Sequence, residues 1–254
     1  MSSPREAPAG APTPSAHQVV LNHVEELIFE GKLSVGDRLP PERELAAQLG
    51  VSRAAAREAI RTLQAQGVLT SQVGSGSSAG THVTAQRSQA LGRLLRLQVA
   101  LAMFPVDDVV VARIALERSS AELAALHRTD EDIETLRRLI RDMQDPHHDA
   151  ASFNEFDTQF HVAIARMGAN TFVSDLTEAI RESLRRPILT AERNLEDWPA
   201  FRNSLIVDHE GIADAIIERR PAEAVARVEE HIRRSYTILP MGRPLSDVAS
   251  RRDD

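Results

Sequence analysis

The chain has 254 residues, a hydrophobic content of 42% and a formal net charge of −7, so it can bury a substantial core in one or two domains. It contains no cysteine, which excludes disulfides, thiolate metal sites and cysteine nucleophiles. The negative charge argues against non-specific binding to nucleic acid or to an anionic membrane, and no segment approaches the roughly 20 apolar residues of a membrane span. We therefore expect a cytoplasmic protein without a membrane partner.

The first predicted domain covers residues 17–84. Apolar side chains recur at helical spacing in residues 17–30. Pro41 and Gly50 mark the start and the end of a second helix, and Ser52 is a suitable N-cap for a third. Two β-prone runs around a loop rich in glycine and serine then predict a hairpin. Three helices and a hairpin are typical of a winged helix-turn-helix domain.

The second predicted domain, residues 85–240, shows helical spacing throughout and no strand pattern. Its predicted helices are 88–102, 107–127, 130–143, 150–167, 171–191, 203–219 and 221–238. The fold class is therefore mostly α, a winged helix-turn-helix followed by an all-α bundle of six or seven helices. Residues 1–16, which are rich in proline and alanine, and residues 241–254 are expected to be tails.

A stripe of arginines lies on the third predicted helix. Arg53, Arg57 and Arg61 are spaced by four and share one face, beside an apolar face that would pack inward. A recognition helix presents such side chains to base edges in the major groove, while Arg38 and Arg43 would hold the phosphate backbone. The alternative is a solvated arginine face on a packing helix. The turn, the caps and the hairpin together favour DNA binding.

A second pattern concerns polar residues at inward positions of the predicted bundle. In "FNEFDTQFH", Asp157 and His161 lie one turn apart beside an apolar stripe, and His209 and His231 lie in register with apolar residues of two later helices. Buried charge without a partner is costly, and one divalent metal would satisfy all four groups. Zinc suits this set best, and nickel, cobalt, manganese or iron also fit. The alternative is that these are hydrogen-bonded core residues.

The segment "GDRLPPERELAAQLGVSRAAAREAIRTLQAQGVL" resembles the DNA-binding domain of the GntR family of bacterial transcription regulators. The resemblance implies a homodimer that binds double-stranded DNA at an inverted-repeat operator. Carried over residue by residue, the family's DNA contacts fall on Arg43, Ser52, Arg53, Arg57 and the wing glycine Gly74.

The helical remainder resembles the FCD-type effector domain of the FadR subfamily. The segments "FDTQFH", "DHEGI" and "EEHI" match the metal pattern of that domain at Asp157, His161, His209 and His231. The resemblance implies that a small carboxylate binds against the metal, and Arg113 matches an arginine of the family that is a candidate anchor for it. The alternative role of Arg113 is a salt bridge to Glu117, one turn further along the helix.

These patterns predict a metabolite-responsive transcription regulator, most simply a repressor released from DNA by its effector. Two other interpretations stay open. In the first, the protein is a metalloregulator that senses the metal itself. In the second, it is a metal-dependent enzyme fused to a DNA-binding domain. No motif supplies the general base and oxyanion stabiliser of a hydrolase, so we expect no enzyme activity and assign no catalytic residue.

Overall fold

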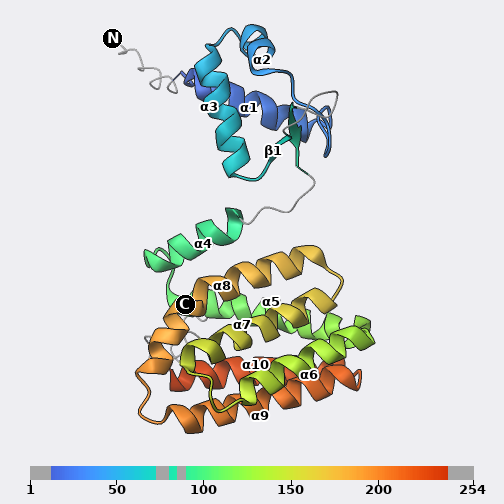
Figure 1. Cartoon of the computed structure of the whole chain (residues 1–254), viewed down its shortest axis with the longest axis vertical. Helices are drawn as coiled ribbons and strands as arrows, with labels where there is room; N and C mark the ends of the chain where they lie inside the picture. The colour runs from blue at the N-terminus through green and yellow to red at the C-terminus, as the bar shows by residue number, and fades with distance from the viewer. Residues whose placement is uncertain (1–12, 73–79, 85–89, 240–254) are drawn as a thin grey trace, which may run out of the picture. The chain divides into compact units, whose positions relative to one another are not determined.

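The computed structural model, drawn in Figure 1, describes residues 13–72, 80–84 and 90–239. The chain divides into two compact units, Met1–Ala90 and Leu91–Asp254, and each is described here by itself. The predicted tails, residues 1–16 and 241–254, lie almost entirely outside the described residues. None of the helices in the described ranges combines the length and the apolar character that a bilayer span requires.

The first unit is a winged helix-turn-helix, as the sequence predicts. Its elements are α1 (Ala16–Phe29), α2 (Glu42–Leu49), α3 (Arg53–Ala65), β1 (Leu69–Gln72) and β2 (Gly80–Val83). Gly50 takes a φ of 66°, which only glycine adopts without cost, and so allows the tight turn between α2 and α3. Ser52 caps α3, because its side-chain oxygen accepts a hydrogen bond from the amide of Ala55 at 3.1 Å.

The wing is an antiparallel hairpin, and the segment before α2 adds a second, short pairing to its strand β2. The amide of Leu39 donates to the carbonyl of Thr81, and the amide of Val83 donates to the carbonyl of Asp37. This pairing places Arg38 beside β2 rather than at the start of α2. Gly80 takes a φ of 140°, which favours glycine, and the side chain of Arg38 lies so close that a β-carbon there would be 2.7 Å from its Nε.

The second unit is an all-α bundle. Six or seven helices were expected, and its described residues form seven. Its helices are α4 (Ala90–Ala100), α5 (Val106–His127), α6 (Asp130–Gln144), α7 (Ala150–Met167), α8 (Thr171–Arg193), α9 (Trp198–Ile217) and α10 (Pro221–Ile238). Figure 1 shows α5 to α10 packed side by side, with α5 against α7, α8, α9 and α10. Phe153, Phe160, Leu184 and Ile212 are among the fully buried side chains of the shared core.

Most predicted helix boundaries of the second unit agree with the structure within two residues, and the largest difference involves a proline. Helix α9 begins at Trp198 instead of residue 203, because Pro199 lies in its first turn, where the missing N–H is not needed. Helix α8 runs through Pro187 and continues to Arg193, past the predicted end at residue 191.

Candidate metal centre and DNA-binding surface

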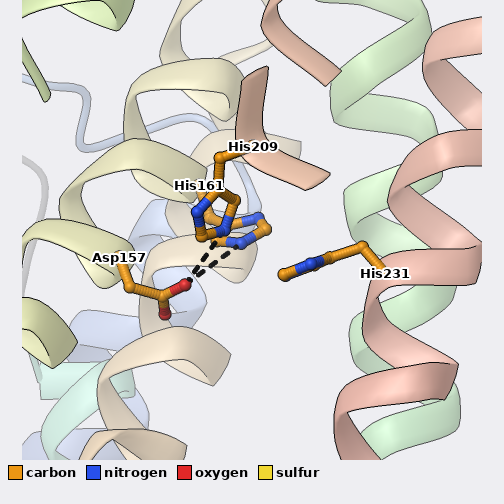
Figure 2. A group of neighbouring side chains, drawn as sticks. All are labelled: Asp157, His161, His209 and His231. Atoms are coloured by element: carbon orange, nitrogen blue, oxygen red, sulfur yellow. Dashed lines mark ion pairs between the residues drawn. The ribbon is translucent and has the colours of Figure 1, made fainter. Parts of the chain in front are cut away.

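Three helices bring the four candidate metal ligands together inside the second unit. Asp157 and His161 lie one turn apart on α7, His209 comes from α9, and His231 comes from α10 on the opposite side (Figure 2). All four are buried, and one ligand atom from each lies within 4.8 Å of the others. Nε2 of His209 lies 3.2 Å from Oδ1 of Asp157, and Nε2 of His161 lies 3.7 Å from the same oxygen.

Three imidazole nitrogens of this cluster lack hydrogen-bond partners among the described residues. Nε2 of His161 and both ring nitrogens of His209 are buried with no partner among the described residues. A buried polar atom without a hydrogen bond costs about 1–3 kcal/mol in proteins. Lone pairs of neutral imidazoles that converge with a carboxylate are a donor set for zinc and its divalent neighbours. The residues present therefore fit a divalent metal ion.

Two further carboxylates orient the histidines from behind. Oε2 of Glu117 lies 2.5 Å from Nδ1 of His161, and Oδ2 of Asp208 lies 3.2 Å from Nδ1 of His231. An ionised carboxylate only accepts hydrogen bonds, so each Nδ1 carries the proton and each Nε2 is left as a free lone pair. Metal-binding histidines in proteins are held in this way. Neither Glu117 nor Asp208 was predicted to orient a histidine.

Burial keeps His161 and His231 neutral. It lowers the pKa of His161 to about 3 and the pKa of His231 to about 4. For Asp157, burial acts to raise the pKa, but the guanidinium of Arg181 and the neighbouring histidines outweigh it and hold the pKa well below its usual value. An ionised aspartate and neutral imidazoles are the protonation states in which these side chains bind metal.

The structure corrects one expectation about Asp157. The sequence suggested that Asp157 depends on the metal to balance its charge, but Arg181 of α8 forms a buried ion pair with it. No role was predicted for Arg181, although its position in the sequence carries a signal. Arg181 lies at helical spacing from Thr177, Leu184 and Ile188, on the buried face of α8.

Arg113, the predicted effector anchor, lies in the same network. Its Nε donates a hydrogen bond of 2.6 Å to Oε1 of Glu117, and both side chains are 3% exposed. The salt bridge that the sequence offered as the alternative role is therefore present. It does not separate Arg113 from the metal centre, because Glu117 is also the carboxylate that lies against His161.

The predicted DNA contacts lie on the surface of the first unit. Arg53 and Arg57 are exposed on α3, Ser52 lies at its N-terminus, and Arg43 is exposed on α2. Nε of Arg57 lies 2.9 Å from a carboxylate oxygen of Glu42, so this arginine also links α3 to α2. Gly74, the predicted wing contact, lies outside the described residues.

Comparison with known proteins gives the family. Residues 16–78 match "Bacterial regulatory proteins, gntR family", and residues 108–234 match the "FCD domain". The putative L-lactate dehydrogenase operon regulatory protein of Escherichia coli strain K12 is 31% identical over 197 residues, which make up 78% of this chain and 76% of that protein. The chain belongs to the GntR family. This GntR protein therefore carries the expected DNA-binding and effector domain types.

Other GntR relatives match over most of their length. The Glc operon transcriptional activator of Escherichia coli strain K12 is 28% identical over 226 residues, 85% of each chain, and the regulator LutR of Bacillus subtilis is 27% identical over 84% of this chain and 96% of its own. The solved structure of Streptococcus agalactiae GntR is 26% identical, covers 85% of this chain and 96% of its own, and superposes with a TM-score of 0.53. The family and these relatives are transcription regulators rather than enzymes.

Proposed function

We propose that this GntR regulator is a metabolite-responsive repressor of the FadR subfamily that leaves its operator when a small carboxylate binds at the metal centre. The observation that carries the proposal is the buried cluster of Asp157, His161, His209 and His231 in a chain that also has a winged helix-turn-helix. These four side chains would hold the ion, and zinc is the metal that the ligand set suits best.

The chemistry of the site favours a carboxylate as the effector. One aspartate among three neutral histidines leaves a bound divalent ion with net positive charge, which an anionic oxygen ligand would complement. Arg113 is buried beside the cluster and supplies a guanidinium that matches a carboxylate in shape. The name of one relative refers to L-lactate dehydrogenase, and lactate is a carboxylate.

The DNA-binding part of the proposal rests on exposed basic side chains. Arg53 would read bases from the N-terminal end of α3, and Arg57 and Ser52 would contact DNA beside it. Arg43 and Arg38 would hold phosphates, and Gly74 would lie at the wing contact. An inverted repeat requires a two-fold homodimer. Sedimentation at micromolar protein concentration would measure the mass of this dimer.

The test is operator release. An operator is first selected from random duplex DNA with zinc-loaded protein, and binding is then followed by fluorescence anisotropy during titration with individual small organic acids. The expected result is a weaker DNA affinity with at least one carboxylate, by a factor set by a coupling energy of about 1–3 kcal/mol.

The same titration separates this proposal from the two other interpretations. If micromolar metal alone switches DNA binding and no organic acid does so, the protein senses the metal. If an acid is consumed during the titration, the helical domain is an enzyme. Either result would contradict a metabolite-responsive repressor.

A further inference from the structure

Arg181 has more hydrogen-bonding capacity than its neighbours use. One terminal nitrogen is paired with Asp157, but Nε and the other terminal nitrogen, Nη1, have no hydrogen-bond partner among the described residues. The side chain is 1% exposed, so water does not solvate these donors. A buried guanidinium with two unused donors is costly, and an anionic ligand would satisfy both.

Arg181 and Arg113 approach the same carboxylate from two helices. Nε of Arg113 lies 2.6 Å from Oε1 of Glu117, and Nη1 of Arg181 lies 3.9 Å from that same oxygen. The shorter contact is a hydrogen bond, while the longer one leaves Nη1 without a close acceptor. The two guanidinium groups therefore meet next to the metal ligands, with only one carboxylate between them.

The charges of this interior balance only while the metal is absent. Arg113 and Arg181 are offset by Glu117 and Asp157, and coordinated histidines are neutral. Asp208, behind His231, is offset by its ion pair with Arg234. Glu192 is hydrogen-bonded to Asn154, and burial together with the negative charge of Asp157 raises its pKa to about 8, so it is mostly protonated near neutral pH. A divalent ion then leaves two positive charges uncompensated in a buried site.

We propose that Arg181 is a second anion-binding residue of the effector site, and that the effector is accordingly a dianion such as a dicarboxylate. One anionic group would face the metal and the other would take the unused donors of Arg181. This inference rests on the proposed function, because it assigns a ligand class to the same site.

The experiment compares acids that differ by one carboxylate. Isothermal titration calorimetry measures the binding of acetate against malonate, and of propionate against succinate, to the zinc-loaded full-length protein. We expect a dicarboxylate to bind wild type about a hundredfold more tightly than its monocarboxylate, the scale of one buried charge-assisted contact.

The variant R181Q should lose this preference, because its affinity for the dicarboxylate falls by about a hundredfold while that for the monocarboxylate changes little. The matched control is R185Q, one turn further along α8, where Arg185 is half-exposed and paired with Glu155. It should behave as wild type. The zinc content of each variant is measured as well. A variant that keeps its zinc but binds the dicarboxylate more weakly has lost an effector contact, whereas a variant that loses zinc has been affected through Asp157.

If R181Q does not fold or does not hold zinc, R181K replaces it in the test. Lysine keeps the positive charge but lacks the planar guanidinium, so R181K should show a reduced preference for the dicarboxylate. The wild-type comparison stands without any variant. If mono- and dicarboxylates bind wild type equally, the dianion inference is wrong and the proposed function stands. If neither class binds at all, both are wrong.

Discussion

Glu192 is a carboxyl group that the folded protein holds in its protonated form. It is 2% exposed, and Nδ2 of Asn154 donates a hydrogen bond of 3.4 Å to it. Burial and the negative charge of Asp157 raise its pKa from 4.5 to about 8. The unfolded chain therefore releases this proton at lower pH than the folded chain, so Glu192 lowers the free energy of unfolding as the pH rises from 4.5 towards 8.

The variant E192Q removes this pH-dependent loss of stability, because glutamine has the same shape as glutamate and no charge. We expect the melting temperature of the metal-free protein to increase on substitution, with a gain that grows between pH 4.5 and 8 and is absent at lower pH. Thermal unfolding across a pH series measures it. E196Q, at an exposed position four residues further on, should leave the profile unchanged, and an equal gain at every pH would contradict the assignment.

His209 tests the metal centre at a single residue. Its side chain is fully buried, and its one close polar neighbour, Asp157 at 3.2 Å, keeps its ion pair with Arg181 when His209 is removed. H209A therefore removes a candidate ligand without leaving a buried charge unpaired. We expect zinc affinity to fall by more than the 10–100-fold that loss of an orienting partner typically costs, with DNA binding retained. Metal analysis after dialysis checks this against H127A, an exposed histidine on α5. An effector response that survives without metal would exclude the metal from sensing.

At the scale of a single helix, we expect α3 to carry the specificity of DNA recognition. Arg53 is exposed next to the N-cap, so R53A should lose about 1–3 kcal/mol of affinity for the selected operator and little for random DNA. R43A, on α2, should weaken both alike, because a phosphate contact carries no sequence information. Competition binding with the two DNAs measures the difference. Unchanged operator affinity in a correctly folded R53A variant would show that Arg53 does not read the operator and would contradict α3 as the recognition helix.

The helices were predictable because their signals are local. Ser52 and Gly50 mark the turn before α3, and the apolar spacing around Phe153 and Phe160 marks the inner face of α7. The convergence of the four candidate ligands was also predictable, since each lies on the inward face of its own helix. Pro199 suggested a joint between two helices, whereas it lies in the first turn of α9, where proline is favoured.

The partners of these ligands were not predictable from spacing. Arg181 reaches Asp157 across 24 positions of sequence, and which face of α8 meets α7 is decided by the packing of the whole bundle. Glu117 was visible only as a partner of Arg113. Its second neighbour, His161, depends on how α5 and α7 pack. Contacts of this kind are tertiary, and one sequence does not encode them in any local pattern.

At the scale of the whole molecule, the two units have separate hydrophobic cores, and the candidate metal ligands belong to only one of them. A metal that binds the folded bundle stabilises that bundle alone, by about 4 kcal/mol when its free concentration is a thousand times its dissociation constant. Chelation should therefore lower the melting temperature of the second unit and leave that of the first unchanged.

The only tryptophan of the chain makes this measurable. Trp198 packs against Phe153, with ring centroids 5.4 Å apart, so its fluorescence reports the second unit, while circular dichroism reports both. We expect a chelator to shift the fluorescence transition and only part of the dichroism transition. A single transition that shifts as a whole in both signals would show that the two units unfold together.

The burial of the four candidate ligands also has a kinetic consequence. His209 is 0% exposed, and His161, His231 and Asp157 are exposed by 1%, 3% and 5%. An ion can enter or leave such a site only when the helices around it open locally, so the rate of exchange is set by the protein's breathing motions and not by collisions with ions in solution. The metal bound to a molecule would then reflect the ions that were present when the molecule folded. It would respond only slowly to later changes in the metal concentrations around the protein.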